Sequence, residues 1–341
     1  MTRSVLVSVA AAILGAVLSL GRSAAGWLLA AEPVRQAVDE GRLQPRLLEG
    51  RKLAATHPAG TRLPDVIYGR KFGMALTLDV LQPAQPNGAG VIWVVSGGFR
   101  SSHAEVEGPG FVQRMGPFMS RGYTVFAVVH GSMPKFEMRE CCSDLHRAVR
   151  YIRLHAKDFG VDAERLGISG GSAGGFLSLW IGCTGSPGNP KSPDPVERES
   201  SRVRAVACFY PPTDWENWDQ PGSNALPTFV RLGIMDGMRF REYDPAKQEH
   251  VLITDEAKVT AILREYSVIH RVSPQSAATL IIHGDKDDIV PLSQATNMIE
   301  KLKAANVPAE LVVRPGLGHG WANMGPDVEK FADWYDKQLA K

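Results

Sequence analysis

Short apolar runs alternate with longer amphipathic stretches over most of the chain beyond residue 64. The apolar runs have the length and residue types of β-strands. They lie at Asp65–Tyr68, Leu76–Leu81, Val91–Val95, Tyr123–Val129, Arg165–Ser169, Val203–Phe209, Thr279–His283 and Glu310–Val313. The later runs are apolar at consecutive positions, which is typical of strands whose two faces are both covered by helices.

The amphipathic stretches predict helices at Glu137–Phe159, Leu292–Ala305 and Val328–Leu339, where apolar residues recur at helical spacing. Gly160 follows the first stretch and is a helix stop signal. Strands that alternate with helices favour an α/β fold built on a mostly parallel, doubly covered sheet.

Residues 212–271 interrupt this alternation, because they are too long for a simple connection between two core strands. We expect them to form a lid inserted between the sixth and seventh core strands. The lid holds Trp215 and Trp218, which are candidate substrate-binding residues because aromatic faces stack on sugar rings and phenolic groups. Packing of the lid onto the core is the alternative for both tryptophans.

The first 31 residues have a different character from the rest of the chain. A basic start at Arg3 precedes an uncharged apolar run at residues 4–20, and Ser23-Ala24-Ala25 offers a small-residue cleavage pattern. This predicts a secretory signal peptide, with an uncleaved N-terminal anchor as the alternative. We therefore expect a periplasmic or secreted protein, with membrane association only if the segment is uncleaved. Residues 32–63 are expected to form an arm that leads into the domain at 64–340.

Composition narrows the possible partners. Hydrophobic residues make up 44% of the chain and charged residues 22%, which is ordinary for a globular protein. The net charge is +2, and no long run of basic residues indicates nucleic-acid binding. The four cysteines, Cys141, Cys142, Cys183 and Cys208, have neither zinc-site spacing nor the pattern of a disulfide framework. We expect buried free thiols and predict no metal site.

The stretch GISGGSAGG at residues 167–175 contains two serines, each of which satisfies the pattern G-x-S-x-G. A nucleophilic serine in this motif sits on a sharp turn between a strand and a helix. Ser169 ends a strand run and is followed by glycines that would make a poor helical turn. Ser172 has the strand behind it and FLSLWIG ahead of it. Ser172 is therefore the predicted nucleophile.

A nucleophilic serine needs a histidine to accept its proton and an acid to hold that histidine. Two further segments provide both downstream of Ser172. TLIIHGDKDDIVP at residues 279–291 is a strand followed by a turn with three aspartates, and LVVRPGLGHGW at residues 311–321 is a strand followed by a glycine-rich loop with His319. Both turns follow strands, at the sheet edge where α/β proteins bind ligands. We predict that His319 is the base.

GGSAGG, HGDKDDIVP and GLGHGW together resemble α/β-hydrolase fold carboxylesterases, over residues 64–340. They are most similar to the branch of hormone-sensitive-lipase-like and feruloyl or acetyl-xylan esterases. In that family the acid belongs to HGxxDxxVP, which selects Asp287, with Asp285 and Asp288 as turn residues. The resemblance implies a serine carboxylesterase acting on short-chain or carbohydrate-linked acyl esters through an acyl-enzyme, with no metal or organic cofactor. The expected partner is a small-molecule or glycan ester.

The resemblance also implies an oxyanion hole. The N–H of Ala173, directly after the nucleophile, is one expected donor. Ser96-Gly97-Gly98-Phe99 stands where the family usually has HGGG, so Gly98 and Phe99 are the other candidates. Here Ser96 replaces the histidine and Phe99 replaces a glycine.

Two alternatives remain open at this point. Oligopeptidase-like serine peptidases of the same fold share a similar HGxxDxxV turn and cleave peptides. Non-catalytic binding proteins of the same fold usually lack the serine or the histidine, and this sequence retains candidates for all three triad positions.

Overall fold

The computed structural model of the chain describes residues 51–52 and 60–340. The predicted signal peptide or anchor at residues 1–31 and most of the predicted arm at residues 32–63 lie outside the described residues. Within the described part of the chain, no helix is both long enough and apolar enough to cross a membrane.

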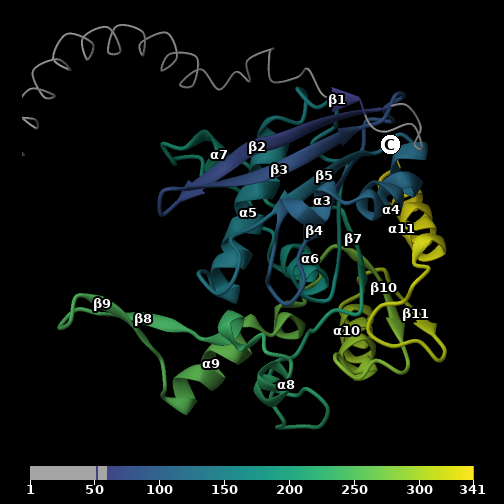
Figure 1. The fold of residues 1–341 in the computed structure, drawn as a ribbon. Coiled ribbons are helices and arrows are strands. Elements are labelled where there is room, and N and C mark those ends of the chain that lie inside the picture. The colour runs from purple at the N-terminus through teal and green to yellow at the C-terminus, as the bar shows by residue number, and fades with distance from the viewer. Residues whose placement is uncertain (1–50, 53–59, 341) are drawn as a thin grey trace, which may run out of the picture. The chain divides into compact units, whose positions relative to one another are not determined.

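A nine-stranded sheet forms the centre of the domain, in the order β1-β2-β3-β5-β4-β6-β7-β10-β11 (Figure 1). Its strands are β1 Arg51–Lys52, β2 Thr61–Lys71, β3 Met74–Gln82, β4 Gly90–Val95, β5 Thr124–Val129, β6 Leu166–Gly171, β7 Ala205–Phe209, β10 Ala278–Gly284 and β11 Ala309–Arg314. Every strand predicted from the sequence lies in this sheet. From β5 to β11 all neighbouring strands are parallel, whereas β1, β2 and β3 add antiparallel pairs at one edge. The prediction of a mostly parallel α/β sheet is confirmed.

Helices cover both faces of the sheet (Figure 1). They are α3 His103–Glu107, α4 Pro109–Ser120, α5 Met138–Leu154, α6 Ala173–Thr184, α7 Pro195–Arg198, α10 Leu292–Ala304 and α11 Gly325–Gln338. Successive side chains of a strand point to opposite faces. Trp93 of β4 thus shares a buried cluster with Phe118 of α4 and Phe331 of α11. On the other face, Val206 of β7 lies against Gly182 of α6.

One predicted helix is shorter than expected. The pattern predicts a helix over Glu137–Phe159, but α5 ends at Leu154. The chain then makes a series of tight turns up to Gly160, which has a φ of +67°. Here the N–H of Val161 turns back to donate to the carbonyl of Ala156 at 2.8 Å. The predicted helix was too long because apolar residues continue at helical spacing up to Phe159, although the chain has already left the helix and turned toward β6.

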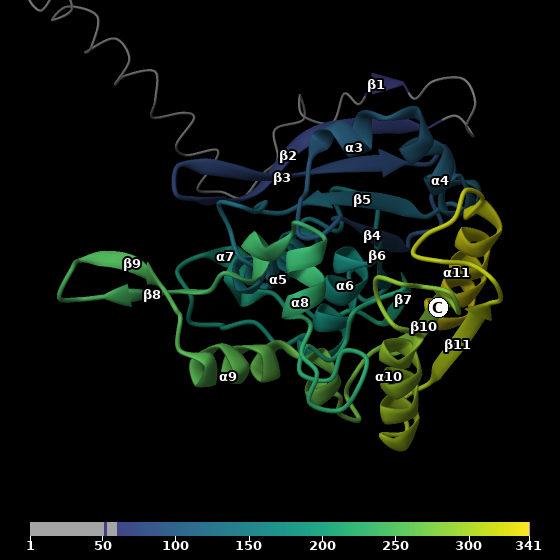
Figure 2. The same ribbon diagram turned by 60° about the horizontal axis from the view of Figure 1, so that its bottom comes forward.

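Residues 212–271, named here the insertion, lie between β7 and β10. They contain α8 Leu226–Arg231, the 3-10 turn η3 Met235–Met238, the strands β8 Arg241–Asp244 and β9 Glu249–Leu252, α9 Glu256–Tyr266 and the 3-10 turn η4 Val268–Arg271. The β8–β9 hairpin has mostly exposed side chains and projects away from the other elements (Figure 2). The segment around α8 instead faces the carboxyl edge of the sheet and forms part of the walls described below.

Candidate active site

Ser172 occupies a strained turn between β6 and α6, with φ +55° and ψ −121°. A non-glycine residue keeps such a backbone only where its surroundings enforce it. The flanking glycines make the turn possible, because a Cβ at Gly170 would lie 2.6 Å from the backbone of Gly174. A Cβ at Gly174 would in turn lie 2.9 Å from the carbonyl oxygen of Val94. The turn lifts the Ser172 hydroxyl to the carboxyl edge of the sheet.

Ser169 has a different environment, although it satisfies the same sequence pattern. It is fully buried within β6, and its hydroxyl lies 2.7 Å from the phenol oxygen of Tyr335 on α11. Ser169 therefore joins a strand to a helix inside the core and has no access to a substrate.

Ser172, His319 and Asp287 form one hydrogen-bonded chain. The hydroxyl of Ser172 lies 2.9 Å from Nε2 of His319, and Nδ1 of His319 lies 2.8 Å from Oδ2 of Asp287. These distances suit proton transfer from the serine to the imidazole, with the carboxylate holding the ring. The structure thus brings the three predicted residues together from three separate loops at one edge of the sheet.

The turn after β10 selects one of its three aspartates. Asp287 has a fully buried side chain and accepts hydrogen bonds from the N–H groups of Ile289 and Val290 at 3.0 and 2.9 Å. Asp285 instead accepts from the N–H of Gly316 at 2.6 Å, and Asp288 is exposed. Among these aspartates, only Asp287 contacts His319.

The environment of Asp287 keeps this carboxyl group ionised. Burial alone would raise its pKa, but hydrogen bonds from His283 and His319, together with the charge of His319, outweigh burial and hold the pKa well below its usual value. Nε2 of His283 lies 3.2 Å from Oδ2 of Asp287 and 2.9 Å from the carbonyl oxygen of Val290. Both neighbours are acceptors, so this nitrogen carries the proton. His283 therefore supports the acid and does not face the serine.

A tight turn after β4 offers two free backbone donors. Gly97 and Arg100 exchange two hydrogen bonds of 2.9 Å across it, and the central residues Gly98 and Phe99 have φ values of +53° and +63°. The N–H groups of Gly98, Phe99 and Ala173 donate to no oxygen of the described residues. All three residues line a cavity at Ser172. They are therefore in place to bind an oxyanion.

Phe99 tolerates its positive φ because its side chain is fixed. The ring is fully buried and packs against Phe176 and Trp215, with centroids 5.9 and 6.3 Å away. Its carbonyl accepts a hydrogen bond from the N–H of Met133 at 3.1 Å. At the position where the family that the sequence resembles usually has a glycine, this chain has Phe99, whose buried ring holds the turn in place.

The two tryptophans of the insertion have different positions. Trp218 lines a small cavity beside Ser172. Trp215 is fully buried between Phe99, Phe176 and Trp218, and it lines neither cavity at Ser172. The structure therefore favours the alternative for Trp215, in which it packs the insertion onto the core, because its side chain is fully buried and lines neither cavity.

Two cavities meet at Ser172. The larger has a volume of about 720 Å³ and is bordered by His319, Tyr210 and Met324, and the smaller has a volume of about 20 Å³. Leu232 and Ile234 of the insertion line both cavities. The larger volume lies within the range of small-molecule sites.

Tyr210 is a residue of this site that the sequence interpretation missed. It follows β7 directly, with a φ of +34°, and its ring centroid lies 4.5 Å from that of His319. A Cβ at Gly171 or at Gly320 would lie within 3.4 Å of its phenol oxygen, so these glycines leave room for the phenol. Its place just after a strand run, at the carboxyl edge, is the sequence signal that could have indicated it.

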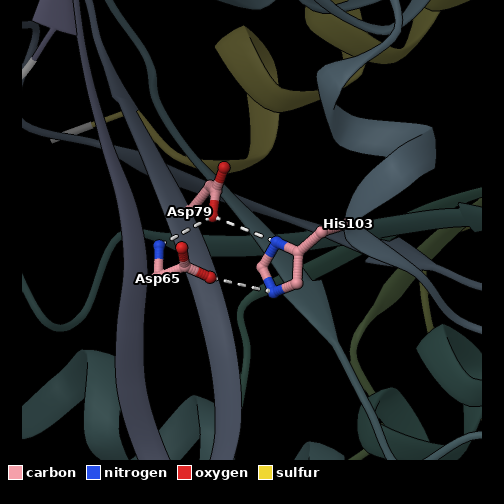
Figure 3. A group of neighbouring side chains, drawn as sticks. All are labelled: Asp65, Asp79 and His103. Atoms are coloured by element: carbon pink, nitrogen blue, oxygen red, sulfur yellow. Dashed lines mark hydrogen bonds and ion pairs between the residues drawn. The ribbon is translucent and has the colours of Figure 1, made fainter.

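A separate group of polar and charged side chains connects the start of α3 to β2 and β3, near one edge of the sheet. Figure 3 shows His103 between Asp65 of β2 and Asp79 of β3, with Nε2 3.4 Å from Asp65 and Nδ1 3.5 Å from Asp79. These atoms are close enough together to hold a cation. However, Nε of Arg62 already donates to the buried Asp79 at 2.8 Å, and the N–H of Asp65 donates to it at 3.0 Å. We interpret the group as a network of polar contacts around the ion pair of Arg62 and Asp79, which positions α3 after the Gly98–Phe99 turn.

Comparison with known proteins places this site in a family. The family model BD-FAE matches residues 78–302, and that of the dienelactone hydrolase family matches residues 265–341. Esterase LipC of Mycobacterium tuberculosis is 24% identical over 248 residues, which cover 71% of this chain and 56% of LipC. The chain thus spans about half the length of this curated relative.

Solved structures share the fold. A truncated form of a carbohydrate esterase from gut microbiota superposes with a TM-score of 0.65 at 22% identity, covering 86% of this chain and 100% of that one. An acetyl ester-xyloside bifunctional hydrolase from Caldicellulosiruptor lactoaceticus superposes with a TM-score of 0.61 at 21% identity, covering 83% and 98%. Since the BD-FAE model spans well over half of the sequence, the chain belongs to the BD-FAE family and has the α/β-hydrolase fold.

Proposed function

We propose that the protein is a serine carboxylesterase that acts through an acyl-enzyme intermediate. The observation that carries the proposal is the hydrogen-bonded chain from Ser172 through His319 to the ionised Asp287, with Ser172 and His319 lining a cavity. Serine is a weak nucleophile by itself, and this arrangement supplies the base and the orienting acid that it needs.

In the first half of the reaction, Oγ of Ser172 bonds to the ester carbonyl carbon and its proton passes to Nε2 of His319. The carbonyl electron pair moves onto the oxygen, which the N–H groups of Ala173 and of the Gly98–Phe99 turn stabilise. The intermediate then collapses, the bond to the alcohol oxygen breaks, and His319 gives its proton to that oxygen. Asp287 stabilises the imidazolium that exists between these two transfers.

In the second half, a water molecule takes the place of the alcohol. His319 accepts a proton from the water, whose oxygen bonds to the acyl carbon. Collapse of the second intermediate breaks the bond to Ser172, and His319 returns the proton to Oγ. The net reaction converts one ester and one water into a carboxylic acid and an alcohol, and leaves the site as it began.

The proposed substrate is a short-chain or carbohydrate-linked ester, small-molecule or glycan. The relatives support this assignment, since one is named a carbohydrate esterase and another an acetyl ester-xyloside hydrolase. The cavity of about 720 Å³ next to His319 leaves room for a large alcohol part, such as a sugar. Export is also part of the proposal and is supported only by the sequence pattern of residues 1–31. N-terminal sequencing of protein recovered from the medium or periplasm tests it.

A comparison of matched ester and amide substrates tests the proposed activity. We expect hydrolysis of 4-nitrophenyl acetate, little cleavage of an N-acylated peptide nitroanilide, and labelling by a fluorophosphonate that Ser172→Ala abolishes and Ser169→Ala retains. Preferential cleavage of the anilide would favour the peptidase alternative. Absence of turnover and labelling in the folded protein would favour the binding-protein alternative.

A further inference from the structure

The loop that carries His319 spans residues 315–324 and connects β11 to α11. Its first half is tied to the turn that carries the acid, because the carboxylate of Asp285 accepts from the N–H of Gly316 at 2.6 Å. Beyond that point, the backbone of residues 318–323 makes no hydrogen bond to any residue that the structure describes. The second half of the loop is therefore held in place by its side chains.

Asp327, in the first turn of α11, is buried and binds the loop region at two places. Its Oδ2 accepts a hydrogen bond from the indole N–H of Trp321 at 2.9 Å, and its Oδ1 accepts one from the guanidinium of Arg314. Hydrogen bonds to an ionised carboxylate are stronger than those between neutral groups. Arg314 is the last residue of β11, and Trp321 lies just beyond His319. One carboxylate thus joins the strand before the loop, the loop itself and the helix after it.

The indole of Trp321 also packs close to the base. Its ring centroid lies 5.9 Å from that of Tyr210, and Tyr210 in turn packs against His319 at 4.5 Å. Gly320, between His319 and Trp321, has a φ of +84°, a conformation that glycine adopts readily. Trp321 lines neither cavity at Ser172. Any effect of Trp321 on the reaction must therefore pass through its neighbours and not through a contact with substrate.

We propose that Trp321 and Asp327 are positioning residues, whose hydrogen bond fixes the loop so that His319 stays in contact with Ser172. This inference rests on the proposed esterase function. Proton transfer depends on the distance of 2.9 Å between Nε2 of His319 and the hydroxyl of Ser172. A displacement of about 1 Å lowers the rate of such a step by roughly 100-fold. A bond that holds the loop therefore contributes to catalysis without touching the ester.

Trp321→Phe is the first test, because it keeps an aromatic ring beside Tyr210 and removes the N–H that Asp327 accepts. With 4-nitrophenyl acetate as substrate, kcat should fall by roughly 10-fold. KM should change little, since His319 serves both halves of the reaction and Trp321 lines neither cavity.

Trp334→Phe is the matched control for this substitution. Trp334 is buried in α11, and its indole nitrogen makes no hydrogen bond to any described residue. The same change from indole to phenyl at this position should leave kcat unchanged. Equal losses in Trp321→Phe and Trp334→Phe would overturn the proposal, because the packing of α11 and not the hydrogen bond would then carry the effect.

Asp327→Asn and the double variant test whether the two residues act as one unit. The amide keeps the size of the carboxylate but offers one acceptor oxygen to two donors. If Trp321 acts through Asp327, the loss of kcat in the double variant should be smaller than the product of the two single losses. A loss equal to that product would overturn the proposed coupling. Should Asp327→Asn fail to fold, Trp321→Phe and its control decide by themselves.

Proton NMR reports on the position of the base directly. The proton in the hydrogen bond between Nδ1 of His319 and Asp287 gives a resonance far downfield of the amide protons, and its shift depends on that contact. The resonance should move or broaden in Trp321→Phe and stay in place in Trp334→Phe. Unchanged kcat in folded Trp321→Phe would show that the positioning role is wrong while the esterase function stands. If the wild type hydrolyses no ester and Ser172 is not labelled by a fluorophosphonate, the proposed function and this inference are both overturned.

Discussion

The aromatic ring of Tyr210 lies against the imidazole of His319, with 4.5 Å between the ring centroids and an interplanar angle of 54°. Tyr210 adopts a φ of +34°, and its N–H donates to the carbonyl of Ile282 in β10 at 3.0 Å. Its backbone is therefore tied to the strand that leads to Asp287. Tyr210 thus packs against the base while it is anchored to the strand that carries the acid.

Substitutions at Tyr210 should distinguish the contribution of its ring to kcat from the contribution of its hydroxyl. Tyr210→Leu should lower kcat by roughly 10- to 100-fold, because a small misplacement of a reacting group has an effect of that size. Tyr210→Phe keeps the ring and removes a hydroxyl whose one hydrogen bond to a described side chain goes to the sulfur of Met324 at 3.9 Å. Its kcat should stay near that of the wild type. Steady-state kinetics decide, and equal losses in both variants would assign the role to the hydroxyl.

The two serines of GISGGSAGG should respond in opposite ways to the same substitution. Ser172→Ala should lower kcat by roughly 10⁴-fold or more and leave stability nearly unchanged. Ser169→Ala should keep activity and lower the free energy of unfolding by about 1 kcal/mol, because it breaks the buried hydrogen bond to Tyr335. Activity assays and urea unfolding of the pair measure both effects. Loss of activity in folded Ser169→Ala would reverse the assignment.

Substitutions of two neighbouring aspartates, Asp287 and Asp288, test which of them is the catalytic acid that orients His319. Asp287→Asn should lower kcat by roughly 10⁴-fold, because an amide no longer stabilises the imidazolium and favours the wrong tautomer of His319. Asp288→Asn changes an exposed neighbour in the same turn and should leave kcat unchanged. Comparable losses in both variants would mean that the turn as a whole, and not the contact of Asp287 with His319, carries the effect.

The depressed pKa of Asp287 has a consequence for stability against pH. A carboxyl group whose pKa is lower in the folded state stabilises that state above its unfolded pKa of about 3.9, and this contribution is lost as the pH falls toward the folded value. The free energy of unfolding of the wild type minus that of Asp287→Asn should therefore be larger at pH 6 than at pH 3. Urea unfolding at the two pH values measures the difference, and no change between them contradicts the depressed pKa.

The sequence allowed the sheet and the nucleophile to be predicted because both follow from local patterns. The apolar runs identified the core strands, and the helix-forming residues after Ser172 distinguished it from Ser169. The β8–β9 hairpin was missed because its strands, REYD and EHVL, are charged and exposed and show no alternation.

Other features depend on contacts that no local pattern encodes. Trp215 and Trp218 are near neighbours in the sequence, and both are buried. Only Trp218 lines a cavity at Ser172, whereas Trp215 packs against Phe99. Tyr210 gains its importance from the distant loop that carries His319. Both depend on the tertiary fold.

Phe99 combines a buried ring with a backbone conformation that favours glycine, and two substitutions can separate the effects of these two features on stability. Phe99→Ala should lower the free energy of unfolding by about 3–5 kcal/mol, as expected for deletion of a fully buried aromatic ring. Phe99→Gly removes the same ring but relieves the positive φ of +63°, which costs an L-residue roughly 1–2 kcal/mol. The glycine variant should therefore be the more stable of the two, although glycine usually destabilises a protein relative to alanine.

Urea unfolding of Phe99→Ala and Phe99→Gly gives this order directly, and kcat reports on the turn itself. Both variants lose the contacts with Phe176 and Trp215 that hold the N–H groups of the turn in place. Their kcat should fall, because a displaced oxyanion donor stabilises the transition state less. A more stable alanine variant would show that the turn relaxes out of its positive φ once the ring is gone. Unchanged kcat in both variants would show that the ring is not needed to hold the donors.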